Sequence, residues 1–107
     1  MGYYTDYDLD ILKCKKEDED LLESEVFQIF FKDLTSYDIE DGLYGIKWYE
    51  HHEHMIKISK QWPDVIFELD GSGEDSSDIW RTYYHNGKSQ HSPGKIIFDE
   101  FDENKLR

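Results

Sequence analysis

The sequence is poor in the residues that build disulfide frameworks, thiolate metal centres and membrane spans. It has one cysteine in 107 residues, so neither an intrachain disulfide nor a Cys-based metal cluster can form. No stretch approaches the roughly 18 apolar residues of a membrane-spanning helix, and the first residues lack a basic region followed by an apolar run. These absences predict a cytoplasmic protein in a reducing interior.

Basic residues are also scarce, with 12 Lys and Arg against 25 Asp and Glu, which leaves a net charge of −13. Residues 1–41 hold 13 acids and 4 bases, a net of −9, whereas 42–70 and 71–107 each come to −2. This sign disfavours direct binding to nucleic acid, because phosphate contacts need Lys and Arg. It favours a partner with a basic surface. An acidic surface that only keeps the protein soluble is the alternative.

Length and aromatic content predict one folded domain over residues 1–107. The hydrophobic fraction is 37%, but 16% of the residues are aromatic, and disordered chains are poor in aromatic residues. Residues 3–11 alternate apolar or aromatic positions with three aspartates, which predicts a half-buried strand. Residues 17–34 carry apolar side chains at helical spacing, with Leu22, Val26 and Ile29 on the predicted apolar face and Phe27 and Phe31 widening it.

The remaining segments predict one more helix and several strands. A helix is expected over 50–61 and should end before Pro63. Strands are expected at 43–49, 65–69, 78–85 and 88–91, the last two joined by a hairpin turn at Asn86-Gly87, with a further short or edge strand at 95–98. The order β-α-β-α-β-β-β predicts an α+β fold, with two helices on one face of a mainly antiparallel sheet.

The C-terminal half carries a motif that resembles a known family. Ser59-Lys-Gln-Trp-Pro-Asp leads into an apolar strand, and Asp78-Ile-Trp-Arg-Thr-Tyr-Tyr is followed by Asn86-Gly-Lys. This stretch is similar to the ferredoxin-like domain of YubB-type proteins from phages and conjugative plasmids, with Trp62 where that family usually has Phe. The resemblance implies a ferredoxin-like fold and a mobile genetic element as the source. It brings no catalytic residues to carry across.

Acidic residues interleaved with tyrosines form the candidate binding surface. Same-face carboxylates along a strand lie roughly 6.6 Å apart, at about 3.3 Å rise per residue, comparable with successive backbone phosphates. Tyrosine supplies a rigid anchor at protein interfaces. The predicted contact residues are Asp6, Tyr7, Asp8, Asp10, Tyr37, Asp38, Glu40 and Asp41. We therefore hypothesise a non-enzymatic phage or mobile-element inhibitor, such as an anti-CRISPR protein, that mimics DNA and blocks the basic nucleic-acid-binding surface of a host protein, for example a CRISPR effector.

Two alternatives stay open. The first is a self-assembling module, a homodimer joined through Phe27, Phe31 or an edge strand at 96–98. The second is a small metal-binding protein that uses His51 and His54, with His85 or His91 as a further ligand. The spacing of His51 and His54 departs from the zincin pattern, so the leading hypothesis includes no metal or cofactor. Cys14 beside Lys15 and Lys16 raises the question of an activated thiol, against a partly buried cysteine at a strand end. No catalytic pattern is present, so an enzyme is not predicted.

Overall fold

A computed structural model describes residues 3–39 and 42–107. The described chain begins with one strand, continues through two helices, and then alternates strand and helix before three consecutive strands. The elements are β1 (Thr5–Lys13), α1 (Lys16–Leu22), α2 (Glu25–Thr35), β2 (Leu43–Ile46), α3 (His51–Gln61), β3 (Ile66–Gly73), β4 (Ile79–His85), β5 (Lys88–Pro93) and a short 3-10 turn at Glu103–Lys105.

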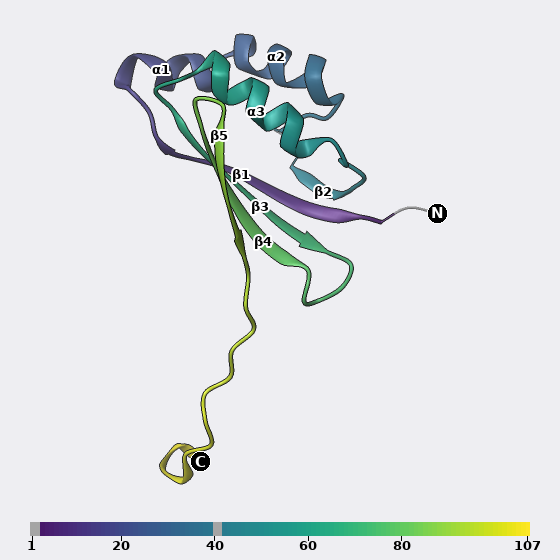
Figure 1. The fold of residues 1–107 in the computed structure, drawn as a ribbon, viewed down its shortest axis with the longest axis vertical. Coiled ribbons are helices and arrows are strands. Elements are labelled where there is room, and N and C mark those ends of the chain that lie inside the picture. Colours follow the sequence, from purple (N-terminus) through teal and green to yellow (C-terminus); the bar gives the residue numbers. More distant parts are fainter. Residues whose placement is uncertain (1–2, 40–41) are drawn as a thin grey trace.

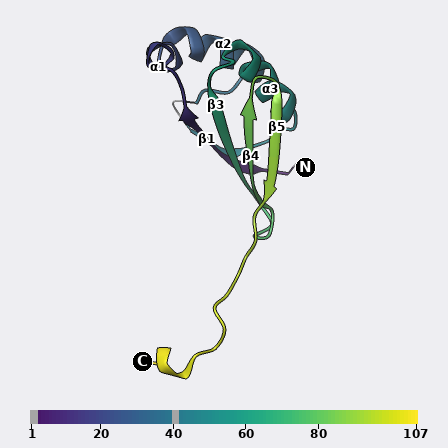
Figure 2. The same ribbon diagram turned by 60° about the vertical axis from the view of Figure 1, so that its left-hand side comes forward.

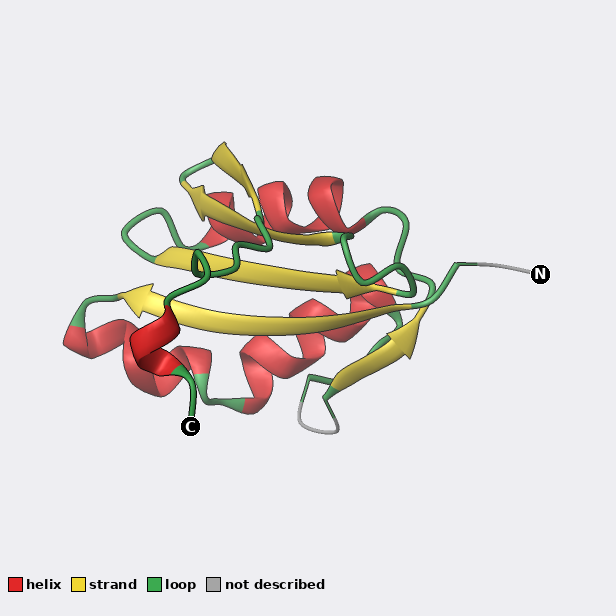
Figure 3. Ribbon diagram, turned by 90° about the horizontal axis from the view of Figure 1, so that it is seen from below, coloured by secondary structure: helices red, strands yellow, loops and turns green. Residues whose placement is uncertain are grey.

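The five strands form one sheet in the order β2-β1-β3-β4-β5, and each neighbouring pair is antiparallel. The three helices lie on one face of the sheet, and the opposite face is left open (Figure 1 and Figure 3). The α+β class and the antiparallel sheet are confirmed. The predicted number of two helices is wrong, since the described residues form three. A ferredoxin-like fold is not confirmed, because that motif runs β-α-β-β-α-β and this chain runs β-α-α-β-α-β-β-β.

The helix predicted over 17–34 is interrupted at Ser24, whose backbone is extended with φ −83° and ψ 166°. This break changes the helical phase, so positions counted across it no longer share a face. Val26 and Ile29 are 61% and 60% exposed, whereas Phe27 and Phe31 are buried. The predicted apolar face is therefore wrong for α2. The same burial excludes Phe27 and Phe31 as dimer contacts.

The core lies between the helices and the covered face of the sheet. Trp48 is at its centre, with edge-on ring contacts to Tyr7 and Phe31 at centroid distances of 5.2 and 5.6 Å. Its indole Nε1–H donates to Nδ1 of His54 at 2.7 Å, which satisfies the one polar group of a nearly buried side chain. The largest fully buried side chains besides Trp48 are those of Tyr84, Phe31, Phe67, Met55, Ile58, Leu69 and Val65.

The turn and stop signals of the sequence are confirmed. Asn86 and Gly87 both have positive φ, 46° and 79°, as a type I′ hairpin requires. The Gly87 N–H also donates to Oγ of Ser59 at 2.9 Å, which ties the hairpin to α3. Helix α3 ends at Gln61, before Pro63. No helix among the described residues has the length and apolar character needed to cross a bilayer.

The prediction of a strand at 95–98 is wrong. After Pro93 the chain continues away from the body as an irregular segment with a single 3-10 turn near its end (Figure 1 and Figure 2). A strand needs a neighbour for its backbone groups, and no described strand of the same chain lies beside this segment. The β-forming composition of residues 95–98 is therefore not enough by itself to make them a strand.

Candidate acidic surface

Two of the predicted aspartates of β1 stand on the open face of the sheet. Asp8 and Asp10 are exposed, because the neighbouring Tyr7 and Leu9 point into the core. Asp6 is also exposed, but its Oδ1 accepts from the Gly45 N–H at 2.6 Å. Asp6 therefore holds β2 against β1, and its carboxylate is partly engaged within the fold.

Strand β3 places further carboxylates directly opposite those of β1. Asp8 is the register partner of Asp70, and Asp10 is the register partner of Glu68. We call Asp8, Asp10, Glu68 and Asp70 the open-face carboxylates. Like charges directly opposite each other across strands are destabilising, so the fold does not require this arrangement.

Glu68 and Asp70 were missed at the sequence level. The strand was predicted to end at residue 69, whereas β3 continues through Gly73. The alternation of Phe67 and Leu69 with the two acids was a usable signal for the open face. It could not show that β3 pairs with β1.

Arg81 from β4 is the cation that faces the open-face carboxylates of β3. Its Nε lies 2.6 Å from Oε1 of Glu68 and 2.7 Å from Oδ1 of Asp70, and its Nη2 donates to Oδ2 of Asp70 at 3.0 Å. The bond to Asp70 is the main cause that raises the guanidinium pKa. The guanidinium of Arg81 thus binds the two acids of β3, and it does not pair with the acids of β1.

Two of the open-face carboxylates, Glu68 and Asp8, have raised pKa values, first through burial and then through neighbouring negative charge. Burial raises the pKa of Glu68, which is 7% exposed, and Asp70, Asp10 and Asp8 add to the effect while Arg81 opposes it. Partial burial also raises the pKa of Asp8, with further contributions from Asp10 and Asp70. The deprotonated forms of Glu68 and Asp8 are therefore disfavoured in the folded protein.

Tyr7 does not belong to the surface, which corrects its predicted role as an anchor. It is 6% exposed, its hydroxyl donates to the Trp48 carbonyl at 3.1 Å, and its ring contacts Trp48, His51 and Trp80. The odd positions of β1 face the helices, so the alternation that exposes the aspartates buries this tyrosine.

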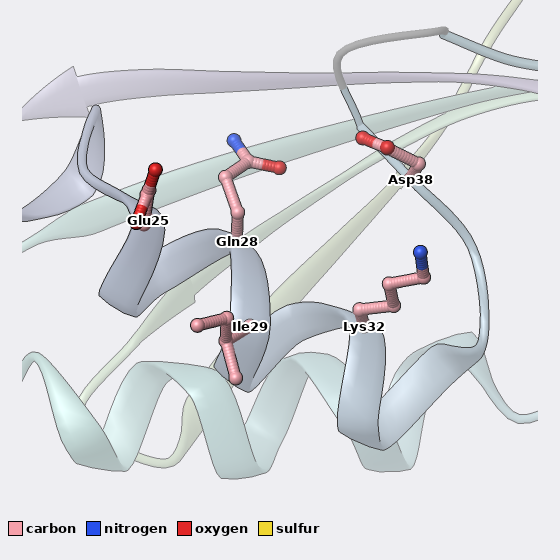
Figure 4. A pocket seen from close by; sticks show the side chains of 5 residues that line it. All are labelled: Glu25, Gln28, Ile29, Lys32 and Asp38. Atoms are coloured by element: carbon pink, nitrogen blue, oxygen red, sulfur yellow. The ribbon is translucent and has the colours of Figure 1, made fainter.

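The second predicted acidic segment lies beside the helices. Tyr37 is half-buried against Trp48, and its hydroxyl donates to the Lys47 carbonyl at 3.3 Å. Asp38 is also half-buried and borders a hollow of about 300 Å³ along α2 (Figure 4), lined by Glu25, Gln28, Ile29, Lys32 and Asp38. Glu40 and Asp41 lie outside the described residues. Tyr37 and Asp38 therefore do not join the open-face carboxylates.

The histidines of α3 are engaged in aromatic packing. His51 stacks on Trp80 at a centroid distance of 5.0 Å, and its Nδ1 lies 2.9 Å from the Trp48 carbonyl. His54 accepts from the indole of Trp48, and His52 contacts the hydroxyl of Tyr84. Within the described ranges, no group of three or more His, Cys, Asp or Glu side chains is placed to hold a metal ion.

Cys14 is half-buried just after β1. Burial raises its thiol pKa, and Glu19, Asp18 and Glu23 raise it further. The question of a thiol activated by Lys15 and Lys16 is thereby answered in favour of the partly buried cysteine, because burial and the acids around α1 raise the thiol pKa. A raised pKa reduces the thiolate fraction at neutral pH, so Cys14 has the properties of a structural cysteine.

Comparison of the chain with known protein families, curated proteins and solved structures gives no indication of its function. No protein-family model matches the chain. No curated protein and no solved structure matches it either. The open-face carboxylates are therefore interpreted from their own chemistry.

Arg81 provides a direct test of how this surface is balanced. Arg81→Gln removes the counter-charge of a nearly buried Glu68, so we expect a lower free energy of unfolding at pH 7. Urea denaturation measures it. The double variant Arg81→Gln with Glu68→Gln should recover most of the loss. Equal stability of Arg81→Gln and wild type would show that the carboxylates do not repel each other appreciably.

Proposed function

We propose that the protein is a non-enzymatic inhibitor that uses its open-face carboxylates to occupy the basic nucleic-acid-binding surface of another protein. The observation that carries the proposal is the pairing of Asp8 with Asp70 and of Asp10 with Glu68 on one face of the sheet, where Asp8 and Asp10 are exposed. A surface that is electrostatically unfavourable in the free protein becomes favourable when a cationic partner covers it.

The geometry of a sheet suits the imitation of a nucleic-acid backbone. Carboxylates along one strand repeat at roughly 6.6 Å and those on neighbouring strands lie about 4.8 Å apart, in a fixed arrangement. A rigid array loses little conformational entropy on binding, unlike a flexible acidic tail. The chemistry of the partner follows from this array: Lys and Arg side chains that otherwise contact phosphates.

The biological setting is inferred from the sequence. The resemblance of the C-terminal half to YubB-type proteins supports a phage or conjugative plasmid as the source. In that setting, a protein that blocks nucleic-acid binding has a host defence enzyme as its natural target, and a CRISPR effector is one such class. The place of action is then the cytoplasm of the host cell.

The proposal is tested with charge variants that are matched in net charge. Immobilised wild-type protein should retain a nucleic-acid-binding protein from a bacterial extract at about 50 mM salt and release it as the salt is raised. Addition of soluble wild-type protein should then displace a labelled oligonucleotide from the purified target. Asp8→Lys with Asp10→Lys should abolish both retention and displacement.

The control variant carries the same charge change outside the sheet. Asp20→Lys with Asp33→Lys alters two exposed helix residues, away from both the open face and the C-terminal tail. It should retain the target and displace the oligonucleotide as wild type does. If both double variants behave alike, the surface is not the open face. If the target binds but the oligonucleotide is not displaced, competition with nucleic acid is the wrong mechanism.

A further inference from the structure

The C-terminal tail, residues 95–107, exposes an unusual concentration of large apolar side chains. Ile96, Ile97, Phe98 and Phe101 are 54%, 81%, 85% and 80% exposed. The tail projects from the end of β5 and runs clear of the core (Figure 2). Apolar side chains grouped in this way on a soluble chain mark a contact site.

Strand β5 offers a free edge for pairing, since it is the last strand of the sheet. The Gly94 N–H donates to the Ile79 carbonyl at 2.8 Å, so Gly94 directs its backbone groups toward β4. The N–H and C=O groups of successive residues point to opposite sides of an antiparallel strand, so those of Ser89 and His91 point outward, away from β4. Pro93 also faces outward and contributes only its carbonyl there.

We propose that the tail of one copy pairs antiparallel with the β5 edge of a second copy, in a symmetrical dimer whose twofold axis passes beside Gly94. Each β5 and its tail form one continuous segment (Figure 1), so two such segments side by side exchange tails reciprocally. Such a dimer leaves no tail or β5 edge free for a third copy, because the tail of each copy pairs with the β5 edge of the other. Backbone bonds supply the affinity, as in other strand-addition complexes.

The register that follows from this axis places apolar side chains over hollows. With Gly94 facing Gly94, Ile96 lies opposite Ser92 and Phe98 lies opposite Gln90. Ser92 borders an open-face hollow of about 490 Å³ whose wall includes Ile79, and Gln90 borders one of about 220 Å³. Both hollows have Tyr83 in their lining.

The same register pairs opposite charges. Glu100 of one copy lies opposite Lys88 of the other. Strand β5 contains no acidic residue, whereas the tail carries four, Asp99, Glu100, Asp102 and Glu103. The edge of β5 is therefore suited to accept a tail of this composition despite the net charge of −13 on each copy.

A second copy fits better than the tail's own sheet. The chain does not reverse at Gly94, which continues the ladder with β4. The next residues, Lys95 to Phe98, contain two β-branched isoleucines and no turn former, which favours an extended course away from the body. At about 3.3 Å per residue, the tail is long enough to run the full length of a neighbour's β5.

Sedimentation equilibrium between about 5 and 500 µM tests the dimer directly. We expect a monomer–dimer equilibrium that strengthens as salt rises from about 50 to 500 mM, because screening relieves the repulsion between two bodies of net charge −13 by more than it weakens the two Lys88–Glu100 contacts. The proposed target binding weakens with salt, so the two interactions separate by the sign of their salt dependence. A monomer at every concentration and salt overturns the dimer and leaves the proposed function untouched.

Proline substitutions locate the contact. Ile97→Pro removes an N–H and an apolar side chain that face the partner's His91, and should weaken the dimer by about 100-fold. Leu106→Pro, which lies beyond the paired span, should have no effect. Both residues are exposed in the monomer, so neither change should alter its folding. A dimer that survives Ile97→Pro is not held by the tail.

A charge exchange tests the register and the second copy together. Lys88→Glu and Glu100→Lys should each weaken the homodimer, since each places like charges opposite. An equimolar mixture of the two variants should recover the wild-type mass, because both contacts between positions 88 and 100 then join a glutamate of one chain to a lysine of the other. Failure of the mixture to associate, with wild type dimeric, would overturn this register.

Discussion

Replacement of Asp8 and Asp10 together by asparagine is expected to make the protein more stable and less able to bind its target. Each substitution removes one like-charge pair across β1 and β3, and such pairs cost about 0.2–1 kcal/mol each. The sum, about 0.5–2 kcal/mol, corresponds to several degrees in the melting temperature of a domain of this size. Thermal unfolding by circular dichroism measures the gain.

The same double variant should lose target affinity by about 100-fold, because a close charge pair at a desolvated interface contributes about 1.5 kcal/mol or more. Its matched control is Asp20→Asn with Asp33→Asn, two exposed helix residues outside both proposed surfaces, which should change neither quantity beyond about 0.5 kcal/mol. A variant that is less stable than wild type would show that these carboxylates support the fold. The open-face carboxylates would then not be the proposed binding surface.

The pH dependence gives an independent check on the open-face carboxylates. The pKa values of Asp8 and Glu68 are raised above their ordinary values of 3.8 and 4.5, so the native state binds protons more readily than the unfolded chain. The cost of charging them is absent below those ordinary values and appears as the pH rises through the raised ones. The stability advantage of the asparagine variant should therefore shrink as the pH falls from 7 to 4.

The contribution of His51 to stability has the opposite pH dependence, and it cancels when wild type and variant are compared. Burial lowers its pKa below 6.5, against the raising effect of its bond to the Trp48 carbonyl. Native stability from this group is present above pH 6.5 and declines as the pH falls through that value toward the lowered pKa. Because His51 is the same in both proteins, only the difference between wild type and variant reports on the carboxylates.

The second large effect is expected at Trp48. Trp48→Ala should cost about 3–5 kcal/mol, a substantial fraction of the roughly 5–15 kcal/mol that typically separates a folded domain from its unfolded chain. Trp48 is 2% exposed, contacts the rings of Tyr7 and Phe31, and bonds to His54. Truncation opens a cavity between the sheet and the helices and leaves His54 without its donor.

Urea denaturation of Trp48→Ala beside Tyr44→Ala measures this effect. Tyr44 is 74% exposed, so its loss should change stability by no more than about 0.5 kcal/mol. Trp48→Phe retains part of the ring and should lie between the two. If Trp48→Ala and Tyr44→Ala are equally stable, the packing described for the core is wrong.

Local patterns in the sequence were sufficient for the class of fold and for most elements. The alternation over residues 3–11 identified a strand with aspartates on one side, and the two positive-φ residues of the hairpin were readable from Asn86-Gly87. Helix α3 and its end before Pro63 followed from spacing and from one breaker. Each of these features depends on residues within a few positions of one another, so its cause is present in the sequence itself.

The same alternation was misinterpreted for Tyr7, because a period of two distinguishes the faces of a strand without showing which face is covered. The break at Ser24 moved Phe27 and Phe31 into the core and Val26 and Ile29 out of it. A helical pattern over residues 17–34 does not reveal an interruption when apolar residues are plentiful on both sides. In the folded protein, the face of α2 that is buried is the one that carries Phe27 and Phe31.

The sequence by itself determined the charge, the strand alternation and the turn chemistry of this protein. Only the tertiary structure decided that β1 lies beside β3. This pairing places Asp8 opposite Asp70 and Asp10 opposite Glu68. Strand pairing joins residues that are far apart in the chain through backbone bonds that are alike for all side chains. Periodicity is a local property, whereas the choice of a neighbouring strand is made by the whole core at once.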